Sequence, residues 1–248
     1  MNKGEVHLWT LPLAAPRNRV AELYSILSAD EHMRVDALRL ERDRQSFIVG
    51  RGLLRLILSY YLGGDPHEHA FEYGAKGKPQ LTNSRAPTLH FNLAHSKGYA
   101  IFAITRDCNL GVDLEFVRDL PELEAISMGS FTPSECEDLF SIDPPLRTER
   151  FFKYWTCKEA YVKATGDGLS LPFDQLQVSF LPGKPPGFTR LERNEFAASE
   201  WSLLPLVPAV GYVGALAVPL PKFALVERTF PSCEDFAAQA SVPNPVEK

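Results

Sequence analysis

Alternating apolar and polar positions predict strands in both parts of the chain. Residues 5–12 alternate and predict a first strand. Residues 88–107 alternate into a strand and residues 109–117 into another, with turn-forming residues from Arg106 to Asn109, so a hairpin is predicted there. Further strands are predicted within QLQVSF, WSLLPLV and VGALAVPL, which proline-rich loops connect.

Apolar residues at helical spacing predict helices between these strands. One helix is expected after Ser28, which forms a capping-box pattern with Glu31. The other predicted helices run over 43–62, begin near Thr132 or Ser134, and run over 148–165 before Gly166. Helices followed by strands in both parts predict an α/β (α+β) fold. We expect one half over 1–108, a second over 109–225, and a loose tail over 226–248.

Composition is that of an ordinary globular chain, but the charge is uneven. The 248 residues are 45% hydrophobic and 23% charged, with a net charge of −5. Residues 1–108 carry +3 and the remainder −8, and six arginines fall between Arg34 and Arg55. This asymmetry suggests an anionic ligand on one side and a cation on the other. Plain solvated helix faces explain it equally well.

No apolar run approaches the roughly 20 residues that a membrane helix needs. The short apolar piece near the N-terminus is interrupted by prolines and does not resemble a signal peptide. The four cysteines show no metal-like pairing, which is typical of free thiols in a reducing compartment. We therefore expect a cytoplasmic protein that does not associate with membranes.

The segment GVDLEFV places two carboxylates on one side of a strand. Residues two apart in a strand point the same way, so Asp113 and Glu115 share a face. Two adjacent carboxylates repel when they are desolvated, and a cation between them makes the pair favourable. An outward polar face of a half-buried strand is the alternative.

The segment FFKYWTCKEAYVKATGDGLS places ionic groups on an otherwise aromatic helix. Trp155, Glu159 and Lys163 are each four apart and form one stripe, with Lys158 about 100° to the side. On a surface, Glu159 and Lys163 would be a helix ion pair worth only ~0.2–0.5 kcal/mol. On a largely buried helix such groups need partners. A third carboxylate facing Asp113 and Glu115 would complete an oxygen site of the kind that magnesium accepts.

Basic residues and one histidine accompany these segments. Lys78 follows a glycine loop that lacks the spacing of a phosphate-binding Walker loop. Arg51 shares a helix stripe with two other arginines, which either reach a ligand or cover the helix surface. His95 by itself would be a structural histidine, but its position after the basic loop favours a phosphate contact.

Four motifs occur in a fixed order: KGKP, FNLAHS, GVDLE and W-x-x-K-E-A-x-x-K. This series closely resembles the 4′-phosphopantetheinyl transferases of the surfactin-synthetase-activating (Sfp) type, over roughly residues 5–220. Each motif alone is weak, whereas the last two at this separation are highly specific.

The resemblance implies a monomer of two similar α/β halves related by a pseudo-twofold, with coenzyme A in the cleft between them. It implies transfer of phosphopantetheine from coenzyme A to a serine of an apo acyl or peptidyl carrier protein, with release of 3′,5′-ADP. Nucleic acid is not an expected partner. The resemblance assigns Mg²⁺, with Mn²⁺ as the alternative, to Asp113, Glu115 and Glu159. It assigns catalysis to Glu159 and Lys163, and coenzyme A contacts to Arg34, Arg51, Lys78, His95, Lys158 and Lys163.

One position departs from the family pattern, and two other functions remain open at this stage. Ala94 stands where many relatives have serine, so no side-chain hydroxyl contact is expected there. Three carboxylates would also serve a magnesium-dependent phosphohydrolase acting on coenzyme A or a nucleotide. A non-catalytic module that binds a nucleotide or a carrier is the third alternative.

Overall fold

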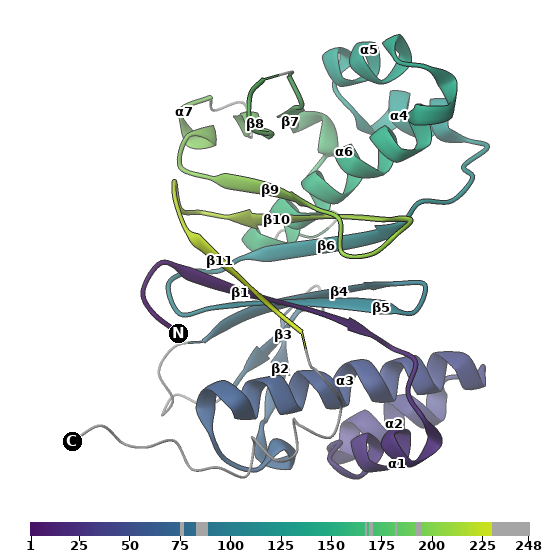
Figure 1. The fold of residues 1–248 in the computed structure, drawn as a ribbon, viewed down its shortest axis with the longest axis vertical. Coiled ribbons are helices and arrows are strands. Elements are labelled where there is room, and N and C mark those ends of the chain that lie inside the picture. Colours follow the sequence, from purple (N-terminus) through teal and green to yellow (C-terminus); the bar gives the residue numbers. More distant parts are fainter. Residues whose placement is uncertain are drawn as a thin grey trace.

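The computed structural model describes residues 1–74, 77–82, 89–166, 168, 171–181, 183–191 and 195–229. Two sheets lie against each other in the middle of the molecule, and each carries a long helix on its outer side (Figure 1). The predicted mixture of helices and strands is confirmed. No helix in the described ranges is long and apolar enough to cross a membrane.

The first half contains one strand, three helices, a short two-stranded sheet and two further strands. In chain order these are β1 (Glu5–Pro12), α1 (Arg17–Ser25), α2 (Ala29–Ala37), α3 (Glu41–Leu62), the 3₁₀ helix η1 (Pro66–Glu68), β2 (Phe71–Tyr73), β3 (Pro79–Leu81), β4 (His90–Ser96) and β5 (Tyr99–Thr105). Strand β5 lies between β1 and β4 and is antiparallel to both.

The second half repeats this order of elements and adds one short helix before its last two strands. It contains β6 (Gly111–Phe116), α4 (Leu123–Ser130), α5 (Pro133–Ser141), α6 (Pro144–Thr165), the 3₁₀ helix η3 (Phe173–Gln175), β7 (Leu176–Ser179), β8 (Gly187–Leu191), α7 (Glu195–Ala198), β9 (Ser202–Leu206) and β10 (Tyr212–Val218). Here β10 lies between β6 and β9, antiparallel to both, as β5 lies between β1 and β4. Helices α3 and α6 each have 22 residues, so the two halves share one plan.

The last strand of the described chain returns to the first half. Strand β11 (Ala224–Arg228) pairs in parallel with β1 at the edge of its sheet, and in Figure 1 it passes in front of the seam between the halves. The predicted boundary between 225 and 226 therefore falls inside a strand, and this boundary is corrected. Residues 230–248 of the predicted tail lie outside the described residues.

The predicted hairpin between 88–107 and 109–117 is wrong. The first segment forms two strands, β4 and β5, which turn at Lys97 and Gly98. Both turn residues have positive φ, 37° and 88°, as a tight two-residue turn requires. Strand β6 pairs with β10 in the other sheet. The lysine–glycine pair was the overlooked turn signal.

The helix predictions are confirmed, with earlier starts for α3 and α6. Ser28 and Thr132 form complete capping boxes at α2 and α5. Helix α6 begins at Pro144, because a proline in the first turn costs no hydrogen bond. It ends where Gly166 takes a left-handed φ of 84°.

Three apolar clusters divide the interior. One packs beneath α3 and one beneath α6. The third lies between the two sheets and includes Val6, Ile101, Val112 and Leu216. Since residues from both halves bury their side chains in this third cluster, the halves form one body around a shared interior.

A buried ion pair holds α6 to its surroundings. Lys158 on α6 is fully buried, and its Nζ donates to Glu135 Oε2 at 2.7 Å and to the carbonyls of Phe173 and Leu176. Glu135 is the third residue of α5, and its carboxylate also accepts the backbone N–H groups of Thr132 and Val178. One carboxylate and one ammonium therefore join α5, α6, η3 and β7.

The first half contains an equivalent buried ion pair, between Glu31 and Arg55. Glu31 is the capping-box glutamate of α2, and its Oε2 accepts from the N–H of Ser28 at 3.0 Å and from Arg55 Nε on α3 at 2.7 Å. Both Glu31 and Arg55 are fully buried. Nη1 of Arg55 lies within hydrogen-bond distance of the carbonyls of Pro66, His67 and His69, in and beyond η1.

Lys158→Met should destabilise the fold, because it leaves the Glu135 carboxylate buried without a cation and two carbonyls without a donor. We expect a loss of about 3–5 kcal/mol in the free energy of unfolding, measured by urea titration. Lys153→Met removes an i,i+4 pair with Glu149 on the same helix and should cost no more than about 0.5 kcal/mol. Equal losses in the two variants would contradict a structural role for Lys158.

Candidate functional site

A glycine brings β6 into direct contact with α6. A methyl group at Gly111 would overlap the backbone of Ala160 and Ala164 on α6. Only glycine allows the strand and helix to approach this closely. The glycine of the GVDLE motif therefore sets the separation between the carboxylates of β6 and the ionic groups of α6.

Asp113 and Lys163 meet across this contact. Lys163 Nζ donates to Asp113 Oδ1 at 2.6 Å, and the aspartate side chain is only 10% exposed. The pKa of Asp113 is raised to about 6: burial raises it most, Lys163 lowers it, and the charges of Glu159 and Glu115 add to the increase. Burial thus has a larger effect on this carboxyl group than its lysine partner has.

Glu115 lies two residues further along the same face of β6, as the sequence predicted. Its Oε2 accepts hydrogen bonds from Ser96 Oγ on β4 at 3.1 Å and from Arg118 Nη1 at 2.8 Å. Arg118 also lies over the ring of Phe152 on α6. The carboxylate is therefore held from both halves of the molecule.

Glu159 lies one turn before Lys163 on α6, and both line a cavity of about 510 Å³. This first cavity is bounded by α6, β4 and the loop after β2, and its lining includes Lys78, Phe91 and Asn92. Burial raises the pKa of Glu159, Lys163 lowers it and Glu115 raises it. Two members of the predicted stripe, Glu159 and Lys163, thus line a cavity, whereas the third, Trp155, packs on the core beneath α6.

Lys78 connects the first half to the end of α6. Its Nζ donates to the Lys163 carbonyl at 2.7 Å and contacts the Leu110 carbonyl at 3.4 Å. Burial and the charge of Lys163 lower the pKa of Lys78 to about 8. Lys78 therefore lies beside the predicted catalytic residues, although 85 positions separate it from Lys163.

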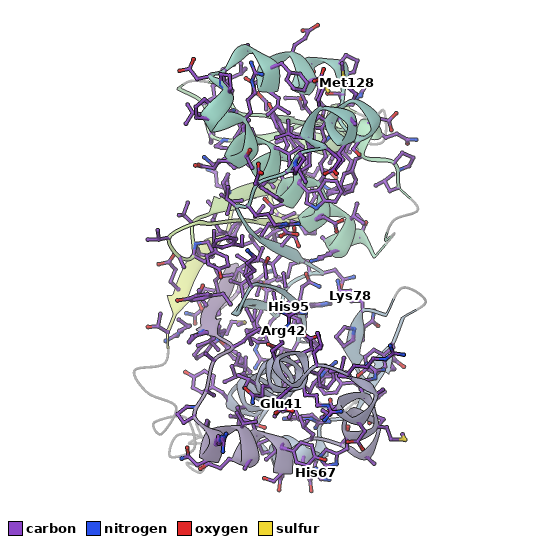
Figure 2. The ribbon with its side chains drawn as sticks, turned by 90° about the vertical axis from the view of Figure 1, so that its right-hand side faces the viewer. Glu41, Arg42, His67, Lys78, His95 and Met128 are labelled. Carbon is purple, nitrogen blue, oxygen red and sulfur yellow. The ribbon has the colours of Figure 1, made fainter. Side chains whose placement is uncertain are left out.

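A second cavity of about 950 Å³ adjoins the first, and both are lined by Arg51 and Leu93. His95 and Lys97 line the second cavity, whose floor is apolar. Burial and the charge of Lys163 lower the pKa of His95, although the residue is exposed by its solvent-accessible surface. In Figure 2, His95 and Lys78 lie near the middle of the long axis, with Arg42 below them.

Arg51 is the most constrained cation of these walls. Its side chain is 10% exposed, its Nε lies 3.4 Å from Glu31 Oε1, and burial lowers its pKa. Within the described residues, its Nη1 is buried without a hydrogen-bond partner. Arg34 is exposed and stacks on the Tyr73 ring at 3.9 Å, beside Arg51.

The structure does not bring Lys158 into the site. All three of its ammonium hydrogens are engaged by Glu135 and two carbonyls inside the protein, so none is left for a ligand. The expectation that Lys158 contacts coenzyme A is corrected. Lys158 and Glu159 are adjacent in sequence, and the 100° between them turns one into the core and the other toward the cavity.

No group of three His, Cys, Asp or Glu side chains in the described ranges is close enough to hold a metal ion. Cations stand at two of the three predicted carboxylates instead: Lys163 at Asp113 and Arg118 at Glu115. The donor set is nevertheless suited to a hard divalent cation, because it consists of carboxylates: burial raises the pKa values of Asp113 and Glu159, and repulsion from neighbouring carboxylates adds to this effect. A bound cation would relieve this repulsion.

Two residues of β4 escaped the sequence analysis. Asn92 Oδ1 accepts the N–H of Val112, and Ser96 Oγ accepts the N–H of Phe116, so β4 side chains satisfy backbone groups of β6. Asn92 and Ser96 lie an even number of positions apart along β4, so they share one face of the strand, opposite to His95. The polar residues of FNLAHS were the available signal, but their partner strand could not be identified before the sheets were known.

The comparisons with known proteins agree on one family. The family model of the 4′-phosphopantetheinyl transferase superfamily matches residues 109–217, and that of the 4′-phosphopantetheinyl transferase N-terminal region matches residues 15–106. The two matches fall on the two halves of the structure.

Individual relatives extend across both halves. The 4′-phosphopantetheinyl transferase HetI of Nostoc sp. is 40% identical over 86% of this chain and 87% of its own length. A putative 4′-phosphopantetheinyl transferase of Synechocystis sp. is 32% identical over 68% of each chain. The 4′-phosphopantetheinyl transferase Sfp of Bacillus subtilis is 29% identical over 67% of this chain and 71% of its own. The chain therefore belongs to the 4′-phosphopantetheinyl transferase family and is an enzyme of this class.

Proposed function

We propose that this enzyme transfers the 4′-phosphopantetheinyl group of coenzyme A to a serine hydroxyl of an apo acyl or peptidyl carrier protein, with the help of a divalent metal ion. One observation carries the proposal. Three carboxylates and Lys163 lie on β6 and α6 beside two adjoining cavities whose walls carry Arg51, Lys78 and His95. Membership of the family supports it.

The cavities suit a nucleotide that carries several phosphates. Arg51 presents a buried Nη1 that lacks a hydrogen-bond partner among the described residues, and a buried donor of this kind favours an anion. Lys78 and Lys163 line the first cavity, and His95 lines the second. Coenzyme A bears a diphosphate and a separate 3′-phosphate, so it offers one anionic group to each cavity. Arg34 extends the positive wall beside Arg51.

The carboxylates suit the divalent ion. Asp113, Glu115 and Glu159 would hold Mg²⁺ or Mn²⁺, and the ion would neutralise the diphosphate when bound. Lys163, the fourth ionic group of this cluster, adds a positive charge at the reacting phosphate. Phosphoryl transfer depends largely on positioning and on neutralising charge, and the wall residues supply both.

Glu159 is the proposed general base. Its carboxylate accepts the proton of the carrier serine as that oxygen bonds to the phosphorus that bears the pantetheine. The bond from this phosphorus to the bridging oxygen breaks, and 3′,5′-ADP leaves with the electron pair. Burial raises the pKa of Glu159, which makes it a stronger base than an exposed glutamate.

Mass spectrometry of an apo-carrier incubated with coenzyme A and the enzyme tests the reaction. We expect the carrier to gain one phosphopantetheinyl group, and 3′,5′-ADP to appear only when the carrier is present. Nucleotide release without a carrier would favour the phosphohydrolase alternative instead. Binding with neither product would favour a non-catalytic module.

Glu159→Gln should separate binding from chemistry, since glutamine retains the size of glutamate but cannot accept the proton. Coenzyme A binding, measured by calorimetry with Mg²⁺, should persist, while single-turnover transfer should slow by roughly 10²–10⁴-fold. Glu149→Gln, on the same helix in a pair with Lys153, is the control and should transfer normally. Equal losses of binding and transfer would leave Glu159 as a ligand and remove it as the base.

His95→Ala should reduce the preference for coenzyme A over 3′-dephospho-coenzyme A, because His95 is proposed to contact the 3′-phosphate. A charge-assisted contact of this kind contributes on the order of 1.5–3 kcal/mol to donor discrimination. The measurement is the ratio of the two dissociation constants. His90→Ala, on the same strand with its ring bonded to Asn109, should keep the parent ratio. An unchanged ratio in His95→Ala would exclude the contact.

Asp113→Asn should stabilise the metal-free protein at pH 8 but not at pH 3. The folded-state pKa of Asp113, about 6, lies above the ordinary value of 3.8, so the ionised carboxylate disfavours folding. This penalty is absent below pH 3.8, grows as the pH rises toward 6, and is complete above it. The gain at pH 8 should be about 1–3 kcal/mol by urea unfolding in chelator. The exposed Asp36, changed to asparagine, should show no such pH dependence.

A further inference from the structure

We propose that Ser96 is a positioning residue that fixes Glu115 for the divalent ion and ties this carboxylate to the strand that carries His95. The inference deepens the proposed function and rests on its metal site. Ser96 lies at the end of β4 in the first half, whereas Glu115 lies on β6 in the second. Their hydrogen bond of 3.1 Å therefore joins the two halves at the site.

The direction of the Ser96 hydroxyl is determined by its neighbours. The backbone N–H of Phe116 donates to Ser96 Oγ at 3.1 Å. The oxygen thus acts as an acceptor toward the backbone, and the single hydroxyl proton is left for Glu115 Oε2. A hydroxyl that is polarised by an N–H in this way is a stronger donor to the carboxylate.

The two carboxylate oxygens of Glu115 differ in their hydrogen-bond partners. Oε2 receives both Ser96 Oγ and Arg118 Nη1. Among the described residues, no side-chain or backbone donor bonds to Oε1. With Oε2 held by two donors, Oε1 is the oxygen that remains for a cation. Arg118 is 43% exposed, so Ser96 is the more firmly placed of the two donors.

Position along β4 connects this contact with the proposed nucleotide site. His95 lines the second cavity from one face of the strand, and Ser96 bonds to Glu115 from the other. The backbone of β4 is paired with β5 at both residues. A shift of the strand that moves His95 therefore also moves the donor to Glu115.

Binding of Mn²⁺ in the presence of 3′,5′-ADP, followed by the electron paramagnetic resonance signal of free Mn²⁺, tests the proposal. Ser96→Ala should weaken Mn²⁺ binding by about 10–100-fold, the usual effect of removing a partner of a metal ligand. Ser96→Thr keeps the hydroxyl and should restore binding. Ser96→Cys fills the space with a weak donor and should give an intermediate loss, so the test stands even where the alanine variant does not fold.

The decisive measurement compares the effect of Ser96→Ala in the parent enzyme with its effect in the Glu115→Gln variant. If Ser96 acts through the Glu115 carboxylate, Ser96→Ala should add little to the weakened binding of Glu115→Gln. Additive losses would show that Ser96 acts on the strand in general and would overturn the proposal. Parent-like Mn²⁺ binding in both Ser96→Ala and Ser96→Cys would also overturn it.

Two further outcomes separate the proposals. Failure of the parent enzyme to bind Mn²⁺ would overturn the metal site, and this inference with it. Normal Mn²⁺ binding by the parent and by all Ser96 variants would leave the metal site standing and overturn the role of Ser96 alone. Ser141→Ala, which removes an exposed hydroxyl bonded to the Asp138 carbonyl, controls for the loss of a serine.

Discussion

A glutamate that caps a short helix and neutralises a cation of the following long helix organises each half of this enzyme. Glu31 does so for Arg55, and Glu135 for Lys158. In both pairs the cation also binds carbonyls of the 3₁₀ segment that follows the long helix. A buried charge without its partner would cost several kcal/mol, so the pair admits only one rotation of the helix. The same solution in both halves agrees with their common order of elements.

The orientation of α6 decides which of its ionic groups reach the cavity. Because the Lys158 side chain is fixed in the interior, the Glu159 side chain is turned about 100° away from it, toward the cavity. Lys163 lies one turn further along α6 on the same side. Because Gly111 has no side chain, β6 and α6 lie close enough for Lys163 to donate a hydrogen bond to Asp113. A structural lysine and the glutamate proposed as the base are therefore neighbours in sequence for one geometric reason, and a motif alone does not tell their roles apart.

Much of the fold could be predicted from the sequence, and the errors have local causes. Period-two and helical patterns located β1, α3 and α6, because each buries one continuous face. The hairpin was misplaced because Lys97 at positive φ is a weak turn signal. Lys158 was misassigned since its partner, Glu135, is 23 residues away. Contacts between strands of different sheets, such as Ser96 with Glu115, depend on tertiary structure and have no local pattern.

Strand β11 completes the sheet of the first half only late in translation. Its partner β1 leaves the ribosome before every other described strand, whereas β11 is the last described strand to do so. Until then β1 has only β5 on one side, and its other edge displays unpaired backbone groups. The nascent first half thus carries an open sheet edge while the whole second half is being translated. Closure of that edge couples the synthesis of β11 to protection against intermolecular strand pairing.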